Sequence, residues 1–394
     1  MQKKTLQNLP TKPNAKKPNP IKSNAQHSST HKTHTKNQKQ HFLDSYFYAP
    51  TLIQKILAFL LLPCSFVYFC IASLKRKIQN IAKQDFGVPI ISVGNLIAGG
   101  SGKTPFIIYL ARFLSQKHYT QIYVISRGYG RQSKGLVWVA KNGEILQSVL
   151  QAGDEPYLIA QNLSEQKISL IVCENRKKAL QEAIKNGAKI ILLDDGFRFG
   201  FCKFDIILRP KIKPYFRFCL PSGIYRESPK IYNQYQTPQS DNQHSNQRNQ
   251  PDKNERKTYQ KNVVLQNGIV LQESVDFVRK VTVQNPSEKM LLLSGIANPT
   301  RLEEFLQNHA QNIVAKITLK DHARFDKNQV KKWLDSTNAT SILTTQKDAV
   351  KLESFGFPLS IMKLDLEVSK EALKPIINYL QHYKKIPTQS NFTR

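Results

Sequence analysis

Short apolar runs alternate with amphipathic segments between residues 88 and 208. The apolar runs predict buried strands at Ile90–Val93, Ile122–Ser126, Ile168–Cys173, Ile190–Leu193 and Phe204–Leu208. Between them, apolar residues recur at helical spacing in Phe106–Gln116, Pro156–Asn162 and Arg176–Asn186. This alternation is typical of a parallel sheet with helices on both faces. We therefore predict an α/β domain over residues 85–229.

A second α/β pattern follows a polar interruption. Residues 230–262 are rich in Gln, Asn, Ser, Lys and Tyr and have no periodicity, which predicts a flexible insertion. Beyond it we expect strands at Met290–Leu293, Ile313–Ile317, Ile342–Leu343 and Leu359–Leu364, and helices at Thr300–Leu306, Asn328–Asp335 and Lys370–Tyr379. These elements predict a second, smaller α/β domain over residues 263–384, followed by a C-terminal tail at 385–394.

The first 84 residues divide into a basic tail and an apolar segment. Residues 1–41 contain no acid and almost no apolar side chain, so we expect a disordered tail, either simply solvated or attracted to anionic lipid. Residues 42–84 contain an uncharged run, Ile56–Leu74, which as a helix is about 28 Å long and is expected to kink at Pro63. A membrane-embedded or interfacial helix is the first interpretation, ahead of a buried core helix and a cleaved signal peptide.

Charge and cysteine content narrow the class of protein. The net charge of +30 indicates an anionic partner, which is a nucleic acid, an anionic membrane or a phosphorylated substrate. No aromatic-basic platform or helix-turn-helix pattern favours a nucleic acid, and none is expected as a partner; no protein partner is predicted either. The five cysteines lack metal-binding spacing, which favours a reduced cytosolic compartment without structural zinc.

A glycine-rich turn joins the first strand to the first helix. Its residues are Ile97, Ala98, Gly99, Gly100, Ser101, Gly102, Lys103 and Thr104. Backbone N–H groups of such a turn bind phosphate oxygens, Lys103 is expected to reach the β- and γ-phosphates, and Thr104 to hold Mg²⁺. The consensus G-x-x-x-x-G-K-[ST] fails at Ile97, where it requires glycine. The context still favours a P-loop NTPase-like sheet that binds ATP and Mg²⁺ over an ordinary turn.

Acidic and histidine side chains follow three other elements. Asp194 and Asp195 end a predicted strand, as in a Walker B motif, and are candidate Mg²⁺ ligands. Asp154, in Gly-Asp-Glu-Pro, is either a helix cap or a general base. His322 is either structural or the acid-base partner of Asp154 across an interdomain cleft.

Two basic turns are candidate substrate contacts. Arg127 lies in Ser-Arg-Gly-Tyr-Gly after a predicted strand, and Arg226 and Glu227 end the turn that begins at Leu220. Arginine side chains match phosphate oxygens, and α/β sheets bind ligands at the carboxyl ends of their strands. A solvated loop is the alternative for both turns.

Seven motifs in chain order resemble the tetraacyldisaccharide 4'-kinase family of lipid A biosynthesis. They are Gly-Gly-Ser-Gly-Lys-Thr-Pro (99–105), Ser-Arg-Gly-Tyr-Gly (126–130), Gly-Asp-Glu-Pro (153–156), Leu-Asp-Asp-Gly-Phe (193–197), Gly-Ile-Ala-Asn-Pro (295–299), Asp-His-Ala-Arg-Phe (321–325) and Thr-Thr-Gln-Lys-Asp-Ala-Val-Lys-Leu (344–352). The resemblance covers residues 45–380.

The resemblance implies a reaction and a location. It implies transfer of the ATP γ-phosphoryl group to the 4'-hydroxyl of a tetraacyldisaccharide 1-phosphate, a lipid A precursor, at the cytoplasmic face of the inner membrane. By position, Asp154 and His322 match the acid-base pair, and Lys103, Thr104, Asp194 and Asp195 match the phosphate and Mg²⁺ residues. Arg127 and Arg226 match substrate contacts, and Ile56–Leu74 matches the lipid-engaging helix.

Two motifs depart from the family pattern, and one other function class stays open. The family continues Asp-Asp-Gly-Phe with Gln-His, where this chain has Arg198 and Phe199, and the proline of its Gly-Pro-Leu-Arg-Glu turn is here Ile224. The alternative is a P-loop GTPase or ATPase with water as acceptor. A guanine motif requires Asn/Thr-Lys-x-Asp, but Lys347 and Asp348 are adjacent, so the spacing fails.

Overall fold

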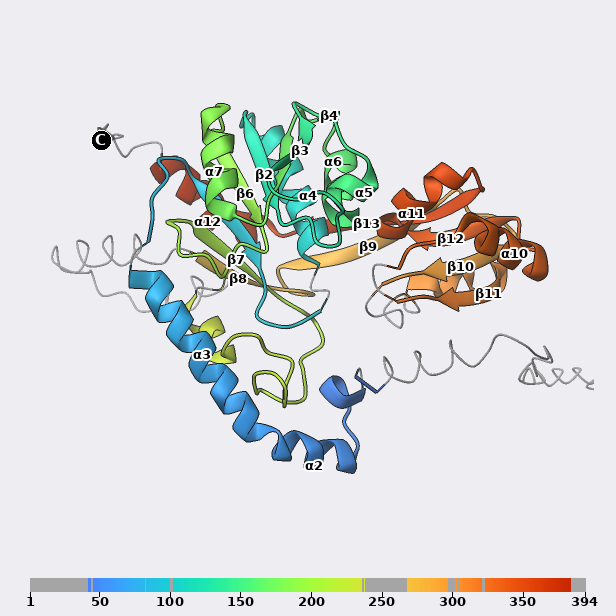
Figure 1. The fold of residues 1–394 in the computed structure, drawn as a ribbon, viewed down its shortest axis with the longest axis horizontal. Helices are drawn as coiled ribbons and strands as arrows, with labels where there is room; N and C mark the ends of the chain where they lie inside the picture. Colours follow the sequence, from blue (N-terminus) through green and yellow to red (C-terminus); the bar gives the residue numbers. More distant parts are fainter. Residues whose placement is uncertain are drawn as a thin grey trace, which may run out of the picture.

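The computed structural model describes residues 42–43, 45–81, 83–99, 102–235, 237, 268–296, 302, 305–320 and 323–383. Within these ranges a large sheet and a smaller sheet lie beside each other, each with packed helices, and two N-terminal helices extend away from the large sheet (Figure 1). The predicted α/β class with a second, smaller α/β unit is confirmed. The basic tail at 1–41, most of the insertion and the C-terminal tail lie outside the described residues.

The large sheet carries the glycine-rich turn. Its strand order is β4-β3-β5-β2-β6-β1-β7-β8, parallel from β5 to β8, with β3 and β4 antiparallel at one edge. Helices α4, α6 and α12 pack on one face and α7 on the other. The strands are β1 (Ile90–Gly94), β2 (Ile122–Ser126), β3 (Val137–Lys141), β4 (Glu144–Ile145), β5 (Ser169–Val172), β6 (Ile190–Asp194), β7 (Phe204–Arg209) and β8 (Gly268–Gln272), and the helices are α4 (Lys103–Gln116), α5 (Val149–Ala152), α6 (Asp154–Asn162), α7 (Arg176–Lys185) and α12 (Lys370–Tyr383).

The small sheet has the strand order β11-β10-β12-β13-β9. Its strands are parallel except β9, which pairs antiparallel with β13 to form a long two-stranded ribbon that leads back to the large sheet (Figure 1). The elements are β9 (Phe277–Gln284), β10 (Met290–Ser294), η3 (Gln307–Asn312), β11 (Ile313–Thr318), α10 (Lys327–Thr337), β12 (Ser341–Thr345), α11 (Gln346–Leu352), η4 (Glu353–Phe355) and β13 (Leu359–Val368).

Two predicted boundaries differ from the structure. Strand β8 and helix α12 fall within residues 263–384, predicted as the second domain, yet β8 pairs with β7 and α12 packs on the large sheet. The predicted insertion begins at 230, but Pro229–Gln234 form the 3-10 helix η1 because Ile231 and Tyr232 are buried. Neither difference is visible as periodicity, since both depend on burial against distant segments.

The N-terminal apolar segment forms two helices. Helix α2 (Leu52–Leu60) begins with a capping box, in which Thr51 and Gln54 each accept the other's backbone N–H, and α3 (Leu62–Ile81) follows with a bend of 53°. The bend lies beside Pro63, as predicted. No single helix among the described residues has the length and hydropathy to cross a membrane, whereas α2 and α3 together meet that test as a bent pair.

Phe277 joins the two-stranded ribbon to the core of the large sheet. It starts β9, is 2% exposed, and its ring centroid lies 5.9 Å from that of Phe106 on α4. Leu366 of β13 enters the same cluster. The ribbon is therefore anchored in the large sheet by apolar contacts from both of its strands.

Because Phe277 fills this junction, Phe277→Ala is expected to lower the free energy of unfolding by about 3 to 5 kcal/mol. Urea denaturation followed by circular dichroism measures the change. Val278→Ala is the matched control, since Val278 is the next residue of the strand and is 40% exposed. Equal losses in the two variants would contradict the anchoring role.

Candidate active site

The glycine-rich turn lies at the carboxyl end of β1. Gly102 has φ +82° and precedes α4, so Lys103 and Thr104 occupy the first helical turn. The described part of the turn is Ile97 to Gly99 and Gly102 to Thr104; Gly100 and Ser101 lie outside the described residues. Phosphate oxygens are favoured here by the free N–H groups and the dipole of the helix N-terminus.

Ile97 explains the departure from the consensus. Its side chain is 2% exposed and lies in a cluster with Leu96, Ile224 and Tyr225. The backbone is fixed there as well, because Ala98 N–H donates to the carbonyl of Ile224 at 2.9 Å. Position 97 therefore holds the turn against the segment that carries Arg226, and its side chain points into the core.

Two carboxylates face this turn from the end of β6. The Lys103 Nζ atom donates to Asn95 Oδ1 at 3.4 Å and lies 3.8 Å from Asp195 Oδ1. Asp194 is buried: Ser126 Oγ donates to its Oδ2 at 2.8 Å, while its Oδ1 has no hydrogen-bond partner among the described residues. Burial, then the charge of Glu155, raises the pKa of Asp194 to about 6.

This donor set fits a divalent cation. The unpartnered buried oxygen of Asp194 requires a positive group, and the Thr104 hydroxyl at the start of α4 is the type of ligand that Mg²⁺ takes in phosphate loops. No group of three or more His, Cys, Asp or Glu side chains within the described ranges is arranged to hold a metal alone.

Asp154 is paired with a cation from the small sheet. It is the first residue of α6, and the cap position is Gly153, whose φ is +91°, so no side chain caps this helix. Instead Asp154 Oδ2 lies 2.9 Å from Nζ of Lys351 on α11. The helix-cap interpretation of Asp154 is therefore not supported by its geometry.

Lys351 brings several of the motif segments together around its ammonium group. Its Nζ atom lies 3.1 Å from Asp348 Oδ1 and donates to the carbonyl of Ala323 at 3.3 Å. The fully buried Asp348 accepts the backbone N–H of Gly295 at 2.8 Å. Ala323 and Asp154 thus share the ammonium group of Lys351 as a partner, whereas His322 lies outside the described residues.

The predicted substrate arginines lie in different settings. Arg127 follows β2 and is exposed. Arg226 donates its backbone N–H to the carbonyl of Leu96 at 2.8 Å, which holds it beside the glycine-rich turn. Glu227 is buried and lies 3.4 Å from Arg198 Nε; burial raises its pKa, and the charge of Arg198 opposes that rise.

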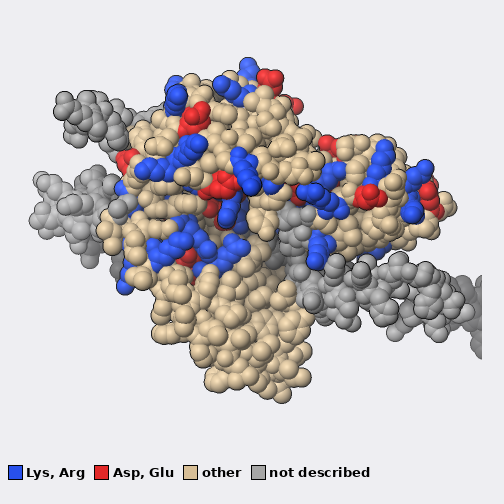
Figure 2. Space-filling view, in the orientation of Figure 1, with Lys and Arg blue, Asp and Glu red and all other residues tan. Residues whose placement is uncertain are grey.

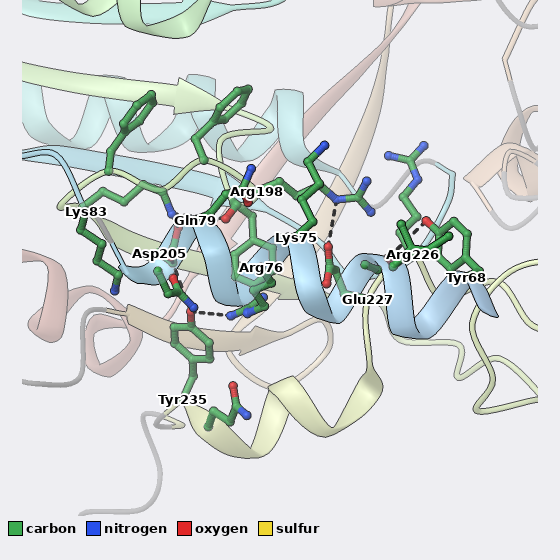
Figure 3. A pocket seen from close by; sticks show the side chains of 18 residues that line it. Tyr68, Lys75, Arg76, Gln79, Lys83, Arg198, Asp205, Arg226, Glu227 and Tyr235 are labelled. Atoms are coloured by element: carbon green, nitrogen blue, oxygen red, sulfur yellow. Dashed lines mark hydrogen bonds and ion pairs between the residues drawn. The ribbon is translucent and has the colours of Figure 1, made fainter. Parts of the chain in front are cut away.

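A basic groove extends from Arg226 along α3. It has a volume of about 400 Å³, and Figure 3 shows cationic side chains from α3 and from the segment after β6 that face it. The cations that line it are Lys75, Arg76, Lys83, Arg198, Lys203 and Arg226, against two acids, Asp205 and Glu227. The excess of positive charge fits an anionic ligand that lies against α3.

A second cavity of about 280 Å³ lies between the two sheets. Thr104 and Tyr109 of α4 line one side, and Val281 and Leu364 of the ribbon line the other. Arg279 of β9 reaches the glycine-rich turn, because a Cβ atom built on Gly102 would lie 2.9 Å from its Nη2. Sequence patterns did not indicate Arg279, and they placed Lys351 in the motif at 344–352 without a role, since each reaches the site from the small-sheet side.

Comparison with known proteins identifies the family of this chain. The family model described as tetraacyldisaccharide-1-P 4'-kinase matches residues 57–381. A tetraacyldisaccharide 4'-kinase of Helicobacter acinonychis is 45% identical over 342 residues, covering 87% of this chain and 96% of that protein. One of Aliarcobacter butzleri is 37% identical over 357 residues, covering 88% and 99%.

A solved structure shares the fold. The crystal structure of LpxK from Aquifex aeolicus in complex with ATP superposes with a TM-score of 0.61 at 24% identity, covering 83% of this chain and 99% of that one. The family match and the relatives span most of the chain. This protein belongs to the tetraacyldisaccharide-1-P 4'-kinase family.

Proposed function

We propose that the protein transfers the γ-phosphoryl group of ATP to the 4'-hydroxyl of a tetraacyldisaccharide 1-phosphate, giving lipid IVA in lipid A biosynthesis. Family membership supports the reaction. The structural observation that carries it is the backbone bond from Arg226 to Leu96, because it joins a basic groove to a phosphate-binding turn. A donor site and an anion-binding groove then meet at one sheet edge, as transfer between two bound substrates requires.

The glycine-rich turn binds the phosphoryl donor, ATP. Lys103 and the N–H groups at the start of α4 bind the β- and γ-phosphates, and the cavity between the sheets receives the rest of the nucleotide beside Thr104. Thr104 and Asp194 hold Mg²⁺, with Asp195 beside Lys103. When bound, Mg²⁺ neutralises charge that develops on the transferring phosphoryl group.

Asp154 accepts the proton of the 4'-hydroxyl. Together with His322 it serves as the base, while Lys351 fixes its carboxylate through the 2.9 Å ion pair. Arg127, Arg226 and Glu227 contact the acceptor headgroup, and the excess of cations in the groove favours its 1-phosphate. The protein's main task is to position two substrates and balance charge, since phosphoryl transfer needs little covalent help.

The acceptor is an amphiphile, and the surface of α2 and α3 suits one. Figure 2 shows a lower lobe with no Lys, Arg, Asp or Glu on this face, where Figure 1 has α2 and the first part of α3, and a group of Lys and Arg side chains directly above it. The exposed apolar residues include Ile53, Phe59 and Phe66. We propose attachment to the cytoplasmic face of the inner membrane through residues 56–74.

Transfer of ³²P from γ-labelled ATP to the acceptor in detergent, with Mg²⁺, tests the function directly. We expect label in the lipid with the wild type and almost none with Lys103→Ala, because Lys103 is the cation of the phosphate loop. Label released as inorganic phosphate, with none in the lipid, would favour the alternative in which water is the acceptor.

The two partners of the interdomain ion pair should both affect turnover. Asp154→Ala is expected to lower kcat roughly 10²- to 10⁴-fold as a lost base, and Lys351→Met roughly 10- to 100-fold as a lost positioning group, with the KM for ATP little changed. Steady-state kinetics measures both. Lys280→Met is the control, because its ion pair with Glu367 is exposed and contributes little. A near-normal rate for Asp154→Ala would remove its catalytic role.

The buried Asp194 predicts a pH-dependent stability of the metal-free protein. Its pKa rises from 3.8 to about 6 on folding, so ionisation opposes folding; the penalty is absent below the lower value and complete above the higher one. Asp194→Asn cannot ionise and should gain stability relative to wild type by on the order of 2 kcal/mol between about pH 4 and about pH 7. Urea denaturation without Mg²⁺ and nucleotide measures it; a difference that does not change with pH would contradict the prediction.

A further inference from the structure

A loop after β7 lies against the N-terminal helices. The backbone N–H of Tyr215 donates to the carbonyl of Phe47 at 2.8 Å, and that of Ser222 donates to Ser65 Oγ on α3 at 2.8 Å. Nζ of Lys55 on α2 lies 4.9 Å from the centroid of the Tyr215 ring. Residues 211–222 and the helix pair therefore form one continuous surface.

Three large apolar side chains of this loop are directed to solvent. Ile212 is 54% exposed, Tyr215 is 53% exposed and Phe218 is 41% exposed. They adjoin α2, where Leu52 and Ile53 are exposed still further. A contiguous apolar surface of this kind is unfavourable in water and marks a surface that has a partner.

The same loop is cationic. Lys211, Lys213 and Arg217 are exposed and alternate with the apolar residues, and the sequence contains no acid from 206 to 226. Aromatic rings interleaved with Lys and Arg match the interface of an anionic bilayer, where rings sit at headgroup depth and the cations meet lipid phosphates. An acidic protein would match the charge but not the continuity with the apolar face of α2 and α3.

We propose that residues 211–218 form a second membrane-contacting loop, which enters the interface of an anionic bilayer beside α2. The protein is then held by two adjoining segments, and α2 lies along the membrane surface because the loop beside it must reach the same depth. This inference rests on the membrane attachment proposed above and does not depend on the identity of the acceptor.

Vesicle co-sedimentation of the full chain tests the loop. The probes are vesicles of phosphatidylcholine with and without phosphatidylglycerol. The triple variant Ile212→Ser, Tyr215→Ser, Phe218→Ser is expected to bind mixed vesicles about tenfold more weakly than wild type. The control is Val278→Ser, Val314→Ser, whose side chains are 40% and 45% exposed on strands β9 and β11 of the small sheet; it should leave binding unchanged.

Charge is tested separately with Lys211→Gln, Lys213→Gln, Arg217→Gln. This variant should lose affinity for mixed vesicles by about fivefold for each charge removed and keep its affinity for neutral vesicles. Unchanged thermal unfolding and ATP binding show that both triple variants are folded, and their rate on a micelle-dispersed acceptor should match that of wild type.

The outcomes separate the two levels of the proposal. Wild-type binding with an unaffected serine variant would overturn the loop's role and leave the membrane attachment in place. Absence of wild-type binding to mixed vesicles would overturn both. Neither result bears on phosphoryl transfer in detergent, so a failure of the kinase assay is recognised independently.

Discussion

The ammonium group of Lys351 links the two sheets at the candidate active site. It lies between Asp154 on α6, which packs on the large sheet, and the buried Asp348 on α11, the helix that also carries Lys351. It also donates to the carbonyl of Ala323. A buried carboxylate without a cation is costly, so Asp348 holds Lys351 in place and Lys351 in turn holds Asp154. The candidate base is therefore positioned by a side chain that is almost two hundred residues away in the chain.

Position 97 and the ribbon show how the rest of the site follows from packing. The phosphate-binding turn keeps its shape because Ile97 is buried and Ala98 is bonded to Ile224, so a side chain there supports the loop. Phe277 ties the ribbon to α4, and the same strand delivers Arg279 to Gly102. On β9, for example, Phe277 packs in the core and Arg279, on the same strand, reaches the glycine-rich turn.

Local patterns predicted β1, β2, β5, β6, β7 and β10 to β13, because each of these strands is a short apolar run between turn residues. They did not predict β3, β4, β8 or β9. The turn at 97–104 and the acids at 194 and 195 were found for the same reason: their residue types and spacing are local. Arg279 was missed, and Lys351 was found only as part of the motif at 344–352, because the roles of both arise only when the sheets meet. The predicted domain range 263–384 includes β8 and α12, which pack with the large sheet, for the same reason: the sheet that a segment joins is not visible in its periodicity.

Helix α12, near the C-terminal end of the chain, packs on the large sheet, so one face of that sheet is covered only after almost the whole chain has been made. Tyr379 of α12 donates to the carbonyl of Ile90, and its ring lies 5.1 Å from that of Phe204. The β1 strand that leads to the phosphate loop is thus covered by nearly the last described residues of the chain. During synthesis this apolar face of the large sheet stays exposed until α12 has been made. An incomplete chain that lacks α12 therefore exposes apolar surface, which favours aggregation and chaperone binding.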